Sequence, residues 1–252
     1  MLHEDSRNGA AIPGGMEFFN QQWASYRAIV EHDLMEHRAV ADATADAIEG
    51  WLAQHPPSAP VMVDLGCGDL ALLGPLLRSL PLTSYTGLDL AGVVLPLAQQ
   101  ALGPVTYSTH WVEGDLLAWA TGDAGNSTAT EPVDILHSAF AIHHLDQTQK
   151  ANFLAAARQR ISPNGIFVWT DVFREPGESR DAYIERYMRR IRTGWQVLTD
   201  EQKDHVINHL SSFDIPADRA EIQATAESCG WQWRWAWDGA HSAEATAVLT
   251  PA

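Results

Sequence analysis

The sequence predicts an α/β fold built on a doubly wound, mostly parallel sheet. Three observations support this prediction. Apolar strand-like runs alternate with helical segments from Val61 to Val172, an order that builds parallel sheets with helices on both faces. A glycine turn directly follows the first of these runs. Two strands of alternating pattern close the chain, so the sheet is expected to finish with an antiparallel C-terminal edge strand paired with its neighbour.

A helical extension is expected before the sheet. Six residues recur at helical spacing between Met16 and Leu52: Phe19, Trp23, Tyr26, Val30, Leu34 and His37. The prolines of Gln54–Pro60 break helix and mark a linker. Residues 1–15 are polar and mixed in charge. We therefore expect a disordered lead at 1–15, an N-terminal helical lid at 16–56 and one main domain at 57–252.

The main domain divides into predicted elements in a simple order. The strands predicted for the parallel sheet are Val61–Leu65, Ser84–Leu90, Val105–Val112, Val133–Ala139 and Ile166–Val172. The helices predicted between them are Leu70–Leu80, Val93–Leu102 and Gln147–Ile161. Two polar helices, Glu178–Ile191 and Thr199–Leu210, interrupt the pattern, so a helical insertion is expected after the fifth strand as a cap at about 176–215. A helix over Pro216–Ser228 leads to the closing strands.

Composition excludes several classes of partner. Thirty-two acidic residues against sixteen basic ones give a formal net charge of −16, which repels phosphate backbones, so no nucleic-acid partner is expected. No run reaches the roughly 18 apolar residues that a membrane-spanning helix needs, and the first residues lack the pattern of a secretory signal. We expect a cytoplasmic protein without membrane contact. Cys67 and Cys229 are too few for disulfides or a cysteine zinc site, and no metal site is expected.

The stretch VMVDLGCGDL, residues 61–70, ends a predicted strand in a glycine turn. Gly66 and Gly68 can adopt conformations that a Cβ would forbid, so the backbone can approach a ligand closely. Alone, these glycines also fit the dinucleotide pattern G-x-G-x-x-A. A nicotinamide-dependent oxidoreductase therefore remains open on the glycines alone.

Three carboxylates favour a different ligand. Asp64 precedes the first glycine, where it would repel a pyrophosphate but hold an amino group. Asp89 ends the second strand and is placed to accept from two ribose hydroxyls. Asp115 follows the third strand and could accept from an adenine amino group. The pattern implies a ligand that carries adenosine and an ammonium group, without phosphates.

In their combined order these motifs resemble the class I S-adenosylmethionine-dependent methyltransferases, over roughly Val61 to Ala252. The resemblance implies a Rossmann-like fold, S-adenosyl-L-methionine as cofactor and S-adenosyl-L-homocysteine as product. The residues that we assign to the cofactor on this basis are Asp64, Gly66, Gly68, Asp89, Leu90, Asp115, Leu116 and Ser138, with Ser138 near the methionine end. The segment Val133–Leu145 looks like the fourth motif of members that act on small molecules. The family's Asn-Pro-Pro-aromatic tetrad is absent, which disfavours amide and nucleobase targets.

Four residues are candidates for the acceptor side. His143 and His144 follow the fourth strand, at the carboxyl edge where open parallel sheets bind ligands. We assign His143 as the catalytic residue that removes a proton from the acceptor, and His144 as substrate-binding. Tyr26 and His37 share a stripe of the N-terminal helix if that helix is unbroken. They contact substrate if the helix forms a lid, and otherwise bury it on the domain.

Two further features have alternative interpretations. Trp231, Trp233, Trp235 and Trp237 share one face of a predicted strand, which favours packing, with a homodimer contact as the alternative. Arg189, Arg190 and Arg192 lie on the predicted cap, where they form a solvated basic face or supply one arginine for a substrate carboxylate.

The function predicted from the sequence is methyl transfer from S-adenosylmethionine to an oxygen, nitrogen or sulfur atom of a small metabolite. The alternatives are an NAD(P)-dependent oxidoreductase, a non-enzymatic regulator that binds the cofactor, and a family member that modifies the sulfonium cofactor instead of transferring its methyl group.

Overall fold

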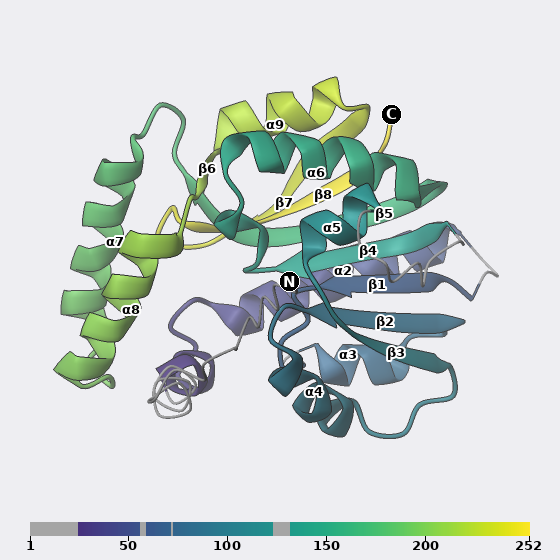
Figure 1. Cartoon of the computed structure of the whole chain (residues 1–252), viewed down its shortest axis with the longest axis horizontal. Coiled ribbons are helices and arrows are strands. Elements are labelled where there is room, and N and C mark those ends of the chain that lie inside the picture. Colours follow the sequence, from purple (N-terminus) through teal and green to yellow (C-terminus); the bar gives the residue numbers. More distant parts are fainter. Residues whose placement is uncertain (1–24, 56–58, 72, 123–131) are drawn as a thin grey trace, which may run out of the picture.

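A computed structural model of the chain describes residues 25–55, 59–71, 73–122 and 132–252. A mixed sheet runs through this part of the chain, with helices on both faces (Figure 1). Its strands follow the spatial order β3-β2-β1-β4-β5-β8-β7, and β6 pairs with β5 outside that path. The strands are β1 (Val61–Leu65), β2 (Ser84–Asp89), β3 (Ser108–Glu113), β4 (Val133–Ala139), β5 (Ile161–Arg174), β6 (Ala217–Asp218), β7 (Trp231–Asp238) and β8 (Glu244–Pro251).

The doubly wound sheet and its antiparallel end are confirmed. Strands β1 to β5 pair in parallel, and β8 lies antiparallel between β5 and the edge strand β7. The chain runs outward from β1 through β2 to β3 and then returns to β4 on the other side of β1. The loops that follow β1 and β4 therefore diverge. Open α/β sheets bind ligands in the crevice that such a reversal leaves at the carboxyl ends of the strands.

Helices cover both faces of the sheet (Figure 1). The described helices are α2 (His37–Gln54), α3 (Gly74–Ser79), η1 (Gly92–Val94), α4 (Leu95–Leu102), α5 (Leu116–Thr121), η2 (Ile142–His144), α6 (Gln147–Arg160), α7 (Arg180–Gly194), α8 (Asp200–Phe213) and α9 (Arg219–Ser228). Helices α5, α6 and α9 share one hydrophobic cluster with the sheet, and α2, α3 and α4 share the other. Helix α5 was not among the predicted elements. None of these helices has the length and apolar content needed to cross a membrane.

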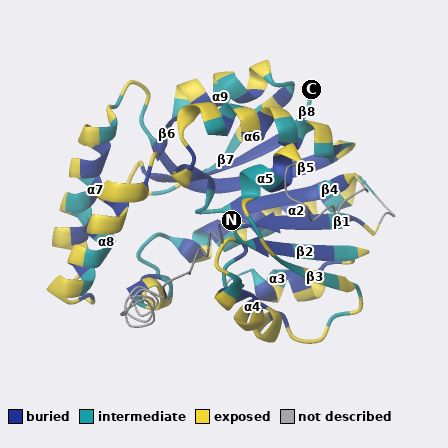
Figure 2. Ribbon diagram, in the orientation of Figure 1, coloured by how far each residue is buried: buried dark blue, intermediate teal, exposed yellow. Residues whose placement is uncertain are grey.

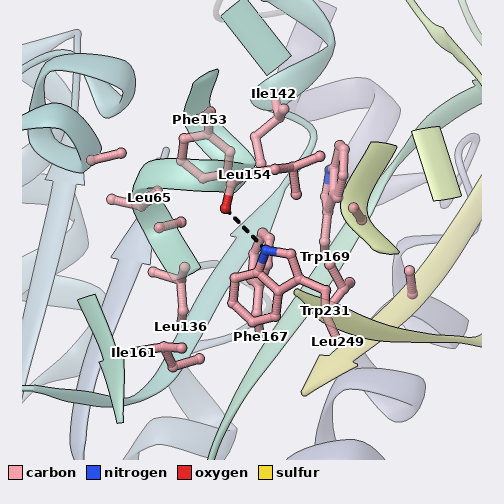
Figure 3. Packing of buried hydrophobic residues seen from close by; sticks show 14 of the residues in the cluster. Leu65, Leu136, Ile142, Phe153, Leu154, Ile161, Phe167, Trp169, Trp231 and Leu249 are labelled. Atoms are coloured by element: carbon pink, nitrogen blue, oxygen red, sulfur yellow. Dashed lines mark hydrogen bonds between the residues drawn. The ribbon is translucent and has the colours of Figure 1, made fainter. Parts of the chain in front are cut away.

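The core follows the two-residue period of the strands. Along β1, Met62 faces the α2, α3 and α4 side, while Val63 and Leu65 face the α5, α6 and α9 side. The central strands are buried almost throughout (Figure 2). On the α6 side, the indole N–H of Trp231 donates to the carbonyl of Leu154 at 3.0 Å (Figure 3). This bond lets the large ring pack without leaving a buried donor unpaired.

The predicted helical insertion after the fifth strand is present. Helices α7 and α8 lie between β5 and β6 in the chain and stand beyond one end of the sheet (Figure 1). A third hydrophobic cluster joins them to the start of the described chain, through residues that include Ile29, Tyr187 and Leu210. The cap and the N-terminal segment therefore form one structure over the carboxyl ends of the strands.

The N-terminal helix is broken, so the condition for a shared stripe of Tyr26 and His37 is not met. Residues 25–31 are helical, the chain turns over residues 32–35, and α2 begins at His37. Asp33 and Glu36 both adopt φ 56°, a left-handed conformation that no helix interior can accommodate. The Asp33 carboxylate accepts the Arg38 N–H at 2.9 Å, which fixes the turn. The predicted stripe from Tyr26 to His37 therefore does not exist, and residues 1–24 lie outside the described part.

The prediction that all four tryptophans share one face of the strand is wrong for Trp237. Trp231, Trp233 and Trp235 pack with the α6 and α9 side of the sheet. The pairing of β7 with β8 shifts between Trp235 and Trp237, which is a β-bulge. A bulge adds one residue to the alternation. Trp237 consequently lines a groove with Arg234 and Ala236 on the α2 side.

Candidate active site

A cavity of about 880 Å³ opens at the carboxyl ends of the strands. Ligand pockets are typically about 300–1,000 Å³, so this one has room for a cofactor and a small second molecule. Its lining includes every predicted site residue except Ser138: Tyr26, His37, Asp64, Gly66, Gly68, Asp89, Leu90, Asp115, Leu116, His143 and His144. The structure thus brings together segments from five parts of the chain at one site.

Backbone N–H groups of the glycine turn after β1 form hydrogen bonds within the protein. Gly66 and Gly68 have φ of 75° and 55°, and a Cβ on Gly66 would lie 2.5 Å from the Cβ of Ala141. The N–H groups of Gly66 and Cys67 donate to the carbonyl of Leu88 at 2.7 and 3.0 Å. Helix α3 begins only at Gly74. The N–H groups of Gly66 and Cys67 and a directly adjoining helix start are therefore not available for the pyrophosphate binding that dinucleotide sites use.

Asp89 connects the turn to the end of β2. One carboxylate oxygen accepts the Gly68 N–H at 2.9 Å, and the other accepts the Ala91 N–H at 2.8 Å. Burial raises the pKa of Asp89 above its ordinary value, although both N–H donors act in the opposite direction. The next residue, Leu90, keeps 72% of its surface exposed beside the cavity. The carboxylate of Asp89 and the exposed apolar side chain of Leu90 therefore lie next to each other at the cavity.

Asp64 is buried beneath the turn with two partners. It accepts from the Tyr85 hydroxyl at 2.9 Å, and its other oxygen lies 2.7 Å from Nδ1 of His137. His137 is buried on β4 and lines the cavity, and sequence analysis missed it. Its signal was a histidine that directly follows the apolar pair Ile135 and Leu136 in a central strand. The role of Asp64 toward an amino group stays a prediction.

Asp115 is the N-cap of the helix that sequence analysis missed. Its side chain accepts the Ala118 N–H at 2.7 Å and so starts α5. A carboxylate has a second oxygen and can cap the helix while it accepts from a ligand. Both Asp115 and Leu116 line the cavity, and their contact with adenine stays a prediction.

Ser138 is the predicted cofactor residue that the structure separates from the rest. Its side chain is fully buried, and its hydroxyl donates to the carbonyl of Leu65 at 2.8 Å. Its neighbours His137 and Ala139 line the cavity instead, because side chains alternate along a strand. This placement gives no support to a role for Ser138 at the methionine end.

His143 forms a buried pair with Asp171, which sequence analysis did not assign to the site. Nδ1 of His143 lies 2.6 Å from one carboxylate oxygen, and the His143 backbone N–H donates to the other at 3.0 Å. Asp171 also accepts from the Trp169 indole at 3.0 Å. The carboxylate thus fixes the imidazole ring, and Nε2 is directed away from Asp171. This arrangement is that of a base held in one tautomer by a carboxylate.

Charge and burial act on this pair in opposite directions. Burial lowers the pKa of His143, but the charge and hydrogen bond of Asp171, together with the charge of Asp214, outweigh it and raise the pKa overall. Burial raises the pKa of Asp171, but His143 and the N–H donors outweigh it and hold that pKa below its ordinary value. The pair therefore favours the ionised form of Asp171 and makes the His143 imidazole more basic.

Asp214, which follows α8, faces His143 across the cavity. Its Oδ1 lies 3.6 Å from Nε2 of His143, 3.8 Å from Nδ1 of His144 and 3.6 Å from Nε2 of His209. Three of these groups, His143, His144 and Asp214, bring one ligand atom each within 4.8 Å of one another, a spacing that a cation could bridge. The expectation of no metal site therefore needs a direct assay.

Tyr26 and His37 both reach the cavity, from the two N-terminal helices. Tyr26 lies over the glycine turn, with its hydroxyl 3.8 Å from where a Cβ on Gly68 would be. His37 is buried against Phe140 with ring centroids 5.4 Å apart, and burial lowers its pKa to about 4. Phe140 itself has φ 53°, an uncommon conformation for a bulky residue that often marks functional sites.

The arginines of α7 are paired within the protein. Arg190 contacts Glu244 at 2.6 Å, Arg189 contacts Glu185 at 3.3 Å and Arg192 contacts Asp204 at 2.5 Å. None of the three lines the cavity. The hypothesis that one of them binds a substrate carboxylate gains no support from these positions.

Comparison with known proteins gives consistent matches. Residues 63–167 match the family model described as a methyltransferase domain. An uncharacterized methyltransferase of Geobacillus kaustophilus is 28% identical over 193 residues, which cover 74% of this chain and 80% of that protein. A trans-aconitate 2-methyltransferase of an Azoarcus species is 28% identical over 135 residues, which cover 53% of this chain and 48% of that protein, so the match spans about half the length of that relative.

A solved structure matches nearly the whole chain. It is that of a plantazolicin methyltransferase in complex with a triazolic desmethylPZN analog and SAH. The TM-score is 0.62 at 11% identity, with 94% of this chain and 97% of that chain covered. At this identity the likeness concerns the fold.

Proposed function

We propose that this chain, which belongs to the class I S-adenosylmethionine-dependent methyltransferases, transfers a methyl group to an oxygen, nitrogen or sulfur atom of a small metabolite. One observation carries the proposal. The glycine turn and the carboxylates suited to an adenosyl cofactor open into the same cavity as the His143–Asp171 pair. Cofactor and acceptor can therefore meet in one enclosed space.

The described residues fit S-adenosylmethionine better than a dinucleotide. The N–H groups of Gly66, Cys67 and Gly68 already donate to Leu88 and Asp89, so these three are not available to phosphates. Asp89 would take the ribose, Asp115 the adenine amino group, and Asp64 with its neighbours the charged amino group. The exposed Leu90 offers an apolar surface for the base. When bound, this cofactor supplies a methyl group on a positively charged sulfur, which is an activated donor.

The chain itself has two tasks in this reaction. The first is to hold the acceptor in line with the donor and away from water, which is the role that we give to α8 and to residues 25–37. The second is to take the acceptor's proton. His143 Nε2 accepts this proton, while Asp171 retains the hydrogen bond to Nδ1 and stabilises the imidazolium that forms.

The class of acceptor is partly restricted by charge. The relative named trans-aconitate 2-methyltransferase would suggest a polycarboxylate acceptor. No described residue that lines the cavity of this chain is Lys or Arg. A polycarboxylate would therefore have no lysine or arginine among the described lining residues to pair with, and this acceptor class is not supported.

The experiment combines native mass spectrometry with a labelled methyl group. Purified protein should retain S-adenosylmethionine or S-adenosylhomocysteine, and S-adenosylmethionine labelled at its methyl carbon should pass label to the small-molecule fraction of a cell extract. Retention of NAD(P), or a bound cofactor whose label never leaves it, would contradict the proposal. The second result would favour a protein that modifies or only binds the cofactor.

A further inference from the structure

The described residues that line the cavity include aspartates and histidines but no Lys or Arg. Five aspartates line the cavity: Asp64, Asp69, Asp89, Asp115 and Asp214. Outside the described residues the sequence contains one basic side chain of the Lys or Arg type, Arg7. The formal net charge of −16 adds a long-range field of the same sign. Such a site concentrates cations and excludes anions.

Two basic side chains near Asp214, those of Lys150 and Arg180, donate hydrogen bonds to backbone carbonyls. The ammonium of Lys150 donates to the carbonyls of Leu145 and Ile215. The guanidinium of Arg180 donates to the carbonyls of Asp214 and Ser211 at 2.8 and 2.7 Å. Neither lines the cavity. Both hold the backbone at the end of the cap in place.

Asp214 presents a buried acceptor atom without a donor. Its residue is 7% exposed, and Oδ1 makes no hydrogen bond within the described residues. The three imidazole nitrogens around it, at 3.6 to 3.8 Å, are beyond hydrogen-bond distance. A buried carboxylate oxygen without a donor is unfavourable, so this atom indicates the place of a ligand's donor group.

His143 contributes a second acceptor at the same point. Because Asp171 is ionised and accepts the hydrogen on Nδ1, the neutral ring carries a lone pair on Nε2. Two acceptors, Nε2 of His143 and Oδ1 of Asp214, therefore face each other across 3.6 Å. A hydroxyl or thiol has one hydrogen and satisfies one of them. An amine nitrogen has enough hydrogens to satisfy both.

We propose that the methyl acceptor is an amine on a mainly apolar body, with its nitrogen held between Asp214 and His143. This inference rests on the proposed methyl transfer and names its acceptor class. The apolar body lies against Ile29 of the N-terminal segment, Phe140 after β4, and lining residues of the cap that include Trp195, Val206 and Leu210.

The reaction balances with groups already named. An ammonium gives one proton to Nε2 of His143 and keeps an N–H that donates to Asp214. The nitrogen lone pair then forms a bond to the methyl carbon while the carbon–sulfur bond breaks. The electron pair of the broken carbon–sulfur bond stays on sulfur. The products are a methylated ammonium and neutral S-adenosylhomocysteine, and the proton on His143 passes to solvent.

The test uses three probes that share one phenyl body: 2-phenylethylamine, 2-phenylethanol and 3-phenylpropionate. Each is titrated by calorimetry into protein saturated with S-adenosylhomocysteine, and each is assayed for methylation with S-adenosylmethionine. We expect the amine to bind at least tenfold more tightly than the alcohol and the carboxylate, and to be the probe that is methylated. Equal binding of the three, or preference for the carboxylate, would overturn the inference.

Asp214→Asn keeps the size of the side chain and removes its charge. We expect this variant to lose the tenfold preference for the amine while it still binds S-adenosylhomocysteine, which shows that it is folded. Asp181→Asn removes the same charge from an exposed position on α7 outside the cavity and should keep the preference. An unchanged preference in Asp214→Asn would contradict the role of Asp214.

Two further outcomes are informative. Failure of the wild-type protein to bind S-adenosylhomocysteine would count against the proposed function itself, whereas normal cofactor binding without amine preference counts only against this inference. One equivalent of zinc in the purified protein, measured by elemental analysis, would also overturn it, because the metal would then occupy the place given to the amine.

Discussion

At the scale of single residues, the account depends most on His143. Its Nδ1 lies 2.6 Å from a buried carboxylate, and its Nε2 faces the cavity and Asp214. We expect His143→Ala to lower turnover by about 10²–10⁴-fold, the usual contribution of a general base, with little change in cofactor affinity. Single-turnover kinetics and calorimetry of the same samples check this. Loss of cofactor binding with unchanged single-turnover chemistry would reverse the assignment.

Asp171 acts on the reaction through His143, and a pH profile tests that action. The charged and titratable groups that face His143 are Asp171 on β5, Lys150 on α6, Asp214 and His209 at α8, and the adjacent His144. Because Asp171 and Asp214 raise the pKa of His143 above its ordinary value, the imidazole stays protonated to higher pH than a free histidine, and the protonated ring cannot accept a proton. Turnover should therefore rise with pH, through a midpoint above the ordinary pKa of histidine.

Asp171→Asn removes the charge that stabilises the imidazolium. We expect this variant to turn over more slowly and to move the midpoint of the profile to lower pH, since the pKa of His143 falls. The same acceptor is used for both proteins, so its own ionisation is common to them. A slower variant with an unmoved midpoint would mean that Asp171 has only a structural role.

Gly66 tests the geometry of the turn. Its φ of 75° and the 2.5 Å separation between an added Cβ and Ala141 leave no room for a side chain. We expect Gly66→Ala to lower the free energy of unfolding by about 2 kcal/mol or more, of which the left-handed conformation costs roughly 1–2 kcal/mol. Gly50→Ala, in the exposed middle of α2 with nothing within 4 Å, should gain up to about 1 kcal/mol. Equal effects in denaturant unfolding would contradict this picture.

Residue types at strand ends predicted residues that line the cavity. The carboxylates and glycines could be predicted because the carboxyl ends of parallel strands lie at the same edge of the sheet. This holds without knowledge of the side-chain conformations. Ser138 was misplaced because its neighbours on β4, not Ser138 itself, face the cavity. Asp171 and Asp214 were missed as site residues because they reach His143 from the interior and from the cap. Contacts between distant segments leave no local pattern in the sequence.

At the scale of elements, the cap is held by a buried ion pair. Arg190 on α7 contacts both oxygens of Glu244 at 2.6 and 2.7 Å, and also donates to the carbonyl of Leu34 at 2.8 Å. Glu244 is 1% exposed. The pair thus connects α7, β8 and the turn between the N-terminal helices. It therefore fixes the position of α7 relative to the sheet.

Arg190→Ala leaves the Glu244 carboxylate buried without its cation. We expect a loss of about 3–5 kcal/mol in the free energy of unfolding. The adjacent Arg189 is the matched control, because its pair with Glu185 is mostly exposed and Arg189→Ala should cost less than about 1 kcal/mol. Denaturant titrations of both variants check the contrast. Similar losses in the two would show that the cap does not depend on this pair.

Element prediction failed where tertiary contacts or single backbone conformations decided the outcome. The parallel strands β1 and β4 were predicted to the residue, because apolar runs with polar ends define them. Helix α5 has six residues and begins with an aspartate that sequence analysis assigned to a ligand. The left-handed Asp33 and Glu36 and the bulge before Trp237 each depend on one residue's backbone. No periodicity anticipates such positions.

At the scale of the whole molecule, the topology and the charge act together. The reversal of strand order at β1 and β4 places the crevice, and α7 and α8 stand beyond that end of the sheet (Figure 1). An excess of acidic residues surrounds a cavity whose described lining contains no Lys or Arg. This charge distribution favours a positively charged ligand over phosphates.

The most direct test of this account is the affinity for S-adenosylhomocysteine, measured by calorimetry in the wild-type protein, Asp89→Ala and Glu113→Ala. Glu113 pairs in register with Asp89 on the neighbouring strand but lies outside the cavity. We predict binding by the wild-type protein and by Glu113→Ala, and affinity about tenfold to a hundredfold weaker in Asp89→Ala, the loss of a hydrogen bond to a charged group. Undiminished affinity in Asp89→Ala, or binding of NAD in place of S-adenosylhomocysteine, would contradict the account.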